Sequence, residues 1–182
     1  MDSLKGHLLI AAPQLGDPNF VRTVILMIDH DENGAFGIVL NRPSGRTVKE
    51  VWDELDDSCE CLESINIGGP VVGPLLALHT QEYLAEAEVL PGLYLTAERE
   101  NLDELVRQDY STFRLFSGYS GWGEGQLEGE LEQGGWITLK AKKEYVFVWD
   151  DDLWDRVGEE ITQDVYRRGL KIKQFPTDPS LN

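Results

Sequence analysis

Two apolar runs joined by a short polar segment constrain the fold of this 182-residue chain more than any other feature. The first run, VILMID, extends from Val24 to Asp29, and the second, AFGIVLN, begins at Ala35. Apolar and β-branched residues favour strands, and the intervening HDENG offers Asn33 and Gly34 for the positive φ angles of a tight turn. The sequence therefore predicts an antiparallel hairpin early in the chain.

Further strands and helices follow the hairpin without an internal repeat or a linker. Apolar runs predict strands at residues 6–12, 65–67, 75–79, 93–96, 113–116, 136–139 and 145–149. The helical spacing of apolar residues predicts helices at residues 47–55, 101–108, 126–133 and 151–170. Thr47 is the expected N-cap of the first helix, with Glu50 as its capping-box partner, and Asn101 is the expected N-cap of the second. We expect one α+β domain, 1–182, with a large mixed, mainly antiparallel sheet flanked by about four helices; residues 162–182 form its C-terminal tail.

The charge of the chain limits its partners. The net charge is −17, which disfavours direct contact with nucleic acid or anionic lipid. No apolar run approaches the roughly 20 residues needed to cross a bilayer, and the N-terminus lacks a signal-peptide pattern. These features predict a cytoplasmic protein. One basic patch departs from the trend, and its residues are Arg167, Arg168, Lys171 and Lys173.

The two cysteines, Cys59 and Cys61, stand in the acidic segment DDSCECLES. A structural zinc site needs four ligands, and no second cysteine pair exists. Neighbouring carboxylates raise thiol pKa values and lower thiol reactivity. We expect a surface loop with incidental thiols, and no metal or cofactor.

A glycine-rich stretch, SGYSGWGEGQLEGEL at residues 117–131, resembles a phosphate loop or a nucleophile turn at first sight. Gln126 stands where a dinucleotide fingerprint needs glycine, and four glutamates crowd the start of the following helix. As a nucleophile elbow, Gly118-Tyr119-Ser120 begins well, but Trp122 replaces the last glycine, and all three histidines precede Ser120. We therefore interpret the glycines as structural, forming a tight corner that close backbone approach requires.

Three stretches resemble the AlgH/YqgE family of bacterial proteins of unknown function. They are residues 4–43, IGGPV at 67–71 leading to Leu78-His79, and GYSGWGEGQLEGEL followed by Gly135-Trp136. Ser120 departs from the small apolar residue expected there, which favours a packing position over a nucleophile. The resemblance implies a compact α/β domain on a large sheet, without an established activity or cofactor. It also implies a suggested link to transcriptional regulation, although the sequence contains no helix-turn-helix signature.

Polar residues beside the predicted strand ends give the candidate site. They are Asp17, Asn19, Arg22, Asn41, Arg42 and His79. Arg22 and Arg42 are notable cations in an acidic chain and are suited to a carboxylate or phosphate, or alternatively to internal pairing with Asp17 or Asp29.

Our leading hypothesis is a non-enzymatic, cytoplasmic protein that binds a small ligand or a protein partner, with an indirect regulatory role. One alternative is a metal- or water-dependent hydrolase using His79, His30 and Asp29, since imidazole and carboxylate bind metals and move protons. The other is a transcriptional regulator that contacts nucleic acid through the basic patch.

Overall fold

The computed structural model describes residues 2–55, 57–108, 112–148 and 152–170, with side chains as far as residue 163. The strands are β1 (His7–Ala11), β2 (Val24–Asp31), β3 (Gly34–Val39), β4 (Pro43–Thr47), β5 (Ser64–Ile67), β6 (Val71–His79), β7 (Ala87–Leu90), β8 (Leu93–Thr96), β9 (Phe113–Gly123) and β10 (Trp136–Lys140). The helices are α1 (Val48–Glu54), α2 (Arg99–Arg107), α3 (Gln126–Glu132), α4 (Lys143–Val146) and α5 (Leu153–Leu170), with a 3-10 turn at Glu82–Leu84.

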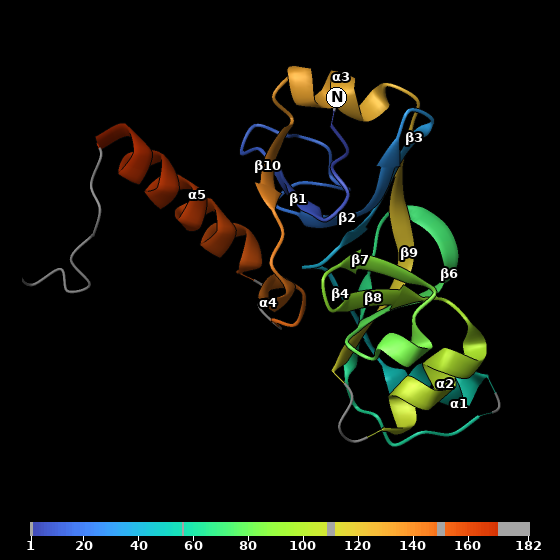
Figure 1. Cartoon of the computed structure of the whole chain (residues 1–182). Helices are drawn as coiled ribbons and strands as arrows, with labels where there is room; N and C mark the ends of the chain where they lie inside the picture. The colour runs from blue at the N-terminus through green and yellow to red at the C-terminus, as the bar shows by residue number, and fades with distance from the viewer. Residues whose placement is uncertain (1, 56, 109–111, 149–151, 171–182) are drawn as a thin grey trace, which may run out of the picture.

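One large sheet organises these elements, as predicted. Its strand order is β10-β1-β2-β3-β9-β6-β8-β7, and β5 joins β9 while β4 joins β5. All pairs are antiparallel except β5 with β9. The long strand β9 connects the two ends of the molecule, with α3 at one end and α1 and α2 at the other (Figure 1).

The predicted early hairpin is formed by β2 and β3. Their last paired residues are Asp31 and Gly34, so Glu32 and Asn33 make the turn. Only Gly34 takes a positive φ there, at 145°, and Asn33 does not. The Asp31 side chain accepts hydrogen bonds from the backbone and the side chain of Asn33. These bonds shape the turn, and Asn33 does not take the left-handed conformation that was expected.

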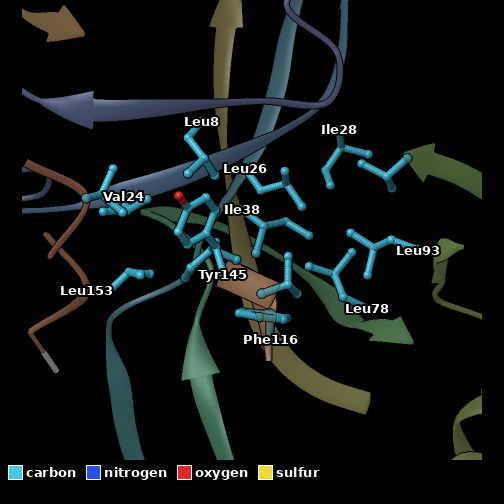
Figure 2. Close-up of a cluster of buried hydrophobic side chains, with 14 of the residues drawn as sticks. Leu8, Val24, Leu26, Ile28, Ile38, Leu78, Leu93, Phe116, Tyr145 and Leu153 are labelled. Atoms are coloured by element: carbon cyan, nitrogen blue, oxygen red, sulfur yellow. The ribbon is translucent and has the colours of Figure 1, made fainter. Parts of the chain in front are cut away.

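The largest hydrophobic cluster lies on one face of this sheet. Figure 2 shows Leu26, Ile38, Leu78 and Phe116 from different strands in one cluster with Tyr145. Tyr145 belongs to α4, which replaces the strand predicted at residues 145–149. That prediction was wrong because the apolar residues of this segment serve a short helix that covers the sheet face rather than extending it.

The helices at the other end confirm some sequence signals and correct others. Thr47 caps α1, and the Glu50 side chain completes the capping box. The helix predicted at residues 101–108 corresponds to α2, in which Leu102, Leu105 and Val106 are buried. The N-cap of α2 is Glu98, so Asn101 lies within the helix and its side chain binds the Leu84 carbonyl and Thr96 Oγ1. Leu55, which the helix predicted at residues 47–55 includes, is instead the C-cap of α1 and is 49% exposed.

Within the described residues, no helix is both long enough and apolar enough to cross a bilayer.

The glycine-rich stretch proves to be mainly strand rather than a corner. Residues 117–123 continue β9, and the turn follows only before α3. The segment after β5 crosses this strand, and a Cβ placed on Gly68 would lie 2.2 Å from the Gly118 carbonyl oxygen. A Cβ on Gly69 would lie equally close to Tyr119. The glycines therefore allow two backbones to cross in contact, as the structural interpretation requires.

Candidate functional site

The loop between β1 and β2 carries three of the predicted site residues, and an aromatic cluster holds it in place. Phe20 stacks on Trp122 with ring centroids 6.2 Å apart and meets Trp136 edge-on at 5.5 Å. Glu130 of α3 accepts hydrogen bonds from both indole N–H groups through Oε2, at 3.0 Å and 2.8 Å. This loop is thus held in place by Trp122, Glu130 and Trp136, which belong to the stretch GYSGWGEGQLEGEL and the Gly135-Trp136 pair that follows it.

Asp17 and Asn19 shape the loop itself. Asp17 Oδ1 accepts the Asn19 backbone N–H at 2.8 Å, and the Asp17 carbonyl accepts from the N–H groups of Phe20 and Val21. These contacts make a local turn of the kind that Asp favours. The structure therefore accounts for Asp17 as a turn residue, and both side chains remain exposed at the loop surface.

Asn41 ties the loop to the end of β3. Its Oδ1 accepts the Val24 backbone N–H at 2.9 Å, and its Nδ2 donates to the Arg22 carbonyl at 2.9 Å. Both ends of the amide are therefore occupied by backbone groups that would otherwise lack partners.

Arg22 connects the loop to α5 rather than to Asp17 or Asp29. Its guanidinium forms an ion pair with Asp155 and lies 4.5 Å from the centre of the Trp154 ring. Among the described residues it is the one non-glycine with a positive φ, at 56°. The expected internal pairing is thus present, but with a different acid, and this contact satisfies the charge of Arg22.

Arg42 has a different environment from Arg22. Its Nη2 donates to the carbonyls of Pro18 at 3.2 Å and Val21 at 3.3 Å, and its own carbonyl accepts the Ile67 N–H at 2.7 Å. Within the described part of the chain, no carboxylate oxygen lies within 4.0 Å of this guanidinium. The predicted pairing of Arg42 with Asp17 or Asp29 is therefore absent, and backbone carbonyls hold the half-buried side chain in place.

Two residues in backbone contact with Arg42 carry exposed apolar side chains. The exposed fractions are 44% for Val21 and 42% for Ile67. We call these two residues together with Arg42 the Arg42 surface. Sequence reasoning missed its apolar part, because the exposure of Val21 and Ile67 depends on how the loop and β5 pack beside Arg42.

His79 does not belong to this site. It ends β6, opposite Phe113 and Tyr94, and is fully buried. Neither ring nitrogen forms a hydrogen bond. Burial lowers the pKa of the imidazole from 6.5 to about 4, and the backbone of Gln81 opposes this shift only in part. The structure places the His79 side chain in the core, beside Phe113 and Tyr94, and its role in ligand binding stays a prediction.

His30 and Asp29, the other residues of the hydrolase alternative, lie elsewhere again. The Leu4 N–H donates to His30 Nδ1 at 2.9 Å, which assigns the ring proton to Nε2, and Nε2 donates to Glu128 at 2.9 Å. The Glu128 pKa is lowered by a hydrogen bond from its own backbone and by His30. No group of three His, Cys, Asp or Glu side chains in the described residues is arranged to hold a metal ion.

The cysteines, Ser120 and the basic patch are the other candidates that the sequence offered. Cys59 and Cys61 are free thiols in a loop whose residues 58, 60, 62 and 63 are exposed, as expected of a surface loop, although Cys59 itself is buried and Cys61 half-buried; burial raises the pKa of Cys61. Ser120 is fully buried, and its hydroxyl faces the Gly68 carbonyl at 3.4 Å, as expected of a packing position. The side chains of the basic patch, Arg167, Arg168, Lys171 and Lys173, lie outside the described residues.

Comparison with known proteins gives consistent matches. A family model described as AlgH-like matches residues 8–166. A UPF0301 protein of Chlorobaculum tepidum is 40% identical over 161 residues, which cover 83% of each chain. One from Shewanella denitrificans is 40% identical over 176 residues, covering 92% of this chain and 96% of the relative.

Two solved structures share the fold. The solution structure of the AlgH protein from Pseudomonas aeruginosa superposes with a TM-score of 0.73 at 29% identity and covers 97% of both chains. A crystal structure of a Corynebacterium diphtheriae protein gives a TM-score of 0.67 at 26% identity, covering 92% of this chain and 88% of the other.

Proposed function

The chain belongs to the AlgH-like family, as its motifs predicted, and on that premise we propose that it is a non-enzymatic binding protein of the cytoplasm. Its Arg42 surface receives a carboxylate or phosphate group of a small ligand or protein partner. A regulatory role of this protein would then be indirect, exerted through that partner. The free thiols of Cys59 and Cys61 suit a reducing compartment.

The single observation that carries the proposal is the state of Arg42. In a chain with net charge −17, its guanidinium contacts backbone carbonyls and no described carboxylate. The two carbonyls fix the planar guanidinium in one orientation before a ligand arrives, which reduces the entropy lost on binding. Its remaining N–H groups are suited to a charge-assisted hydrogen bond with an anion.

The apolar side chains of the same surface add to the argument. Val21 is 44% exposed and its carbonyl accepts a hydrogen bond from Arg42, while Ile67 is 42% exposed and donates its backbone N–H to the Arg42 carbonyl. Exposed apolar groups around a fixed charge are typical of binding sites, because the apolar groups provide area while the charge gives orientation. The preferred ligand therefore presents an anionic group next to an apolar one.

A thermal-shift screen tests the proposal. The probes are acetate, succinate, citrate, inorganic phosphate and pyrophosphate, each read against the ligand-free melting temperature of the same variant. A probe at about one hundred times its dissociation constant adds about 2.7 kcal/mol and raises Tm by about 5–10 °C. We expect such a rise in the natural protein and its loss in Arg42→Gln.

Arg46→Gln is the matched control, because it removes the same charge from an exposed pair with Glu54. It should keep the full response. A panel without any response in folded protein, or a response that Arg42→Gln leaves unchanged, would contradict the proposal.

A further inference from the structure

Both cysteines of the chain line one cavity at the end of the molecule that carries α1 and α2 (Figure 1). Its volume is about 490 Å³. The rest of the lining comes from the same loop, residues 58–63, and from the end of α2 and the start of β9, with Val106, Arg107, Gln108 and Phe113. Both cysteines are free thiols, so two sulfur ligands share one cavity.

The loop turns the two cysteines to the same side. Ser58, Glu60 and Leu62 are exposed, whereas Cys59 is buried and Cys61 is half-buried. An extended backbone produces this alternation, because side chains two residues apart share a face. Both cysteines pack in the same hydrophobic cluster. Burial and, in smaller part, the neighbouring Cys59 raise the pKa of the Cys61 thiol, which agrees with two sulfur atoms that lie close together.

Helix α1 holds this loop in place through the backbone of the cysteines. The Lys49 backbone N–H donates to the Cys61 carbonyl at 2.9 Å, and Lys49 Nζ donates to the Cys59 carbonyl at 3.4 Å. The N–H of Val48 donates to the Glu63 carbonyl at 2.9 Å. Both cysteines are therefore fixed before a ligand arrives, which reduces the entropy lost on binding.

Two cations lie within electrostatic reach of Cys59. The pKa of Arg107 is raised by its hydrogen bond to Asp57 and, in smaller part, by Cys59. The pKa of Lys49 is raised by its hydrogen bond to Glu60 and, in smaller part, by Cys59. A negatively charged thiolate complex at this position is thus stabilised by two neighbouring positive charges.

We propose that Cys59 and Cys61 bind one soft monovalent metal ion, Cu(I), as a two-coordinate dithiolate site. Thiolates select soft ions such as Cu(I), and each thiol releases its proton as its sulfur bonds to the ion. One Cu(I) and two thiols therefore give a complex with a single negative charge and two free protons. The expectation that these thiols are incidental is replaced by this proposal.

The choice of ion follows from the number of ligands. Glu60 and Glu63 also line the cavity, but within the described residues no three His, Cys, Asp or Glu side chains are grouped to hold a metal ion. Structural Zn²⁺ needs four ligands, whereas Cu(I) is satisfied by two thiolates. Because Cys59 is buried, an ion bound to its sulfur is also shielded from soluble thiols that compete for it.

Anaerobic titration with Cu(I) tests the site, with bicinchoninate as the coloured competing chelator. We expect the reduced natural protein to take one ion per chain from the chelator, and X-ray absorption of the complex to show two sulfur neighbours. Cys61→Ser and Cys59→Ala should each lose this uptake. Far-UV circular dichroism and Tm verify that each variant is folded.

The matched control keeps two thiols in the chain. Cys61→Ser combined with Leu55→Cys moves one thiol to a half-exposed position that does not line the cavity, and it should lose uptake as Cys61→Ser does. A natural protein that takes no copper from the chelator overturns the proposal. So does uptake of one ion per two chains, or equal uptake by the relocated-thiol variant. Arg42→Gln should bind Cu(I) like the natural protein, so this proposal and anion binding at Arg42 succeed or fail separately.

Discussion

His79 is a buried imidazole that the fold keeps neutral. With both ring nitrogens unpartnered and the side chain fully buried, its pKa falls from 6.5 to about 4. The unfolded chain binds a proton below pH 6.5, whereas the folded chain does so only near pH 4. The stabilisation that depends on neutral His79 is therefore complete above pH 6.5 and is lost as the pH falls towards 4.

We predict that His79→Leu removes this acid sensitivity. Relative to the variant, the natural protein should lose about 2 kcal/mol of unfolding free energy between pH 7.5 and pH 5, since one pKa unit corresponds to about 1.4 kcal/mol. Urea unfolding of both proteins at the two pH values measures the difference, and subtraction cancels the other titrating groups. A difference that does not change with pH would show that the His79 pKa is not lowered.

Glu130 shows how one acceptor can stabilise two aromatic residues. Its Oε2 receives the indole N–H groups of Trp122 and Trp136, both of which are buried. A buried donor left without an acceptor costs about 1–3 kcal/mol. The third sequence motif thus owes part of its composition to this contact rather than to a ligand.

We expect Glu130→Ala to lower the unfolding free energy by about 2–4 kcal/mol, because it leaves two indole donors unsatisfied. Glu130→Gln keeps an acceptor oxygen and should cost less. Glu132→Ala, an exposed position at the end of the same helix, is the control and should stay within about 0.5 kcal/mol. Equal losses for Glu130→Ala and Glu132→Ala would refute this account of the two tryptophans.

Among the elements, β9 is the one whose glycines have distinct roles. Gly118 has a φ of 72°, and a Cβ there would lie 2.6 Å from the Val71 carbonyl oxygen. Gly123, five residues later in the same strand, has open space around it. The crossing segment therefore requires glycine at position 118 but not at position 123, although the sequence has glycine at both.

Gly118→Ala should therefore destabilise the protein by about 2–4 kcal/mol through a strained φ and a backbone contact. Gly123→Ala, the same change in the same strand, should stay within about 0.5 kcal/mol. Thermal unfolding of the two variants provides the comparison. If both lose the same stability, the crossing does not explain the glycines.

Local signals predicted most of these elements but not their tertiary roles. Thr47 and Glu50 identified the start of α1 because a capping box is encoded within four residues. The apolar segment at residues 145–149 was mistaken for a strand because burial against a sheet face requires apolar residues in a helix as well. Asn101 resembled a cap, but its amide is used by Leu84, seventeen residues earlier in the chain.

For the molecule as a whole, the candidate site was predictable in part. Asp17, Asn19, Arg22, Asn41 and Arg42 do lie together, because the ends of adjacent antiparallel strands meet at one edge. The sequence could not show that Asp155, 133 residues from Arg22, neutralises one of the two arginines. Nor could it show that β6 directs His79 into the core, since that depends on strand order.

The pairing of β1 with β10 also sets a condition on how the protein is made. Antiparallel register joins His7 to Lys140, so one edge of β1 acquires its partner only after most of the chain has left the ribosome. Synthesis adds roughly 5–20 residues per second, so this edge of β1 stays unpaired for several seconds at least. An open strand edge can pair with other chains. Nascent chains of this protein therefore pass through a stage in which Leu9 and Ile10, buried in the finished sheet, still lack their partners Thr138 and Ile137 of β10.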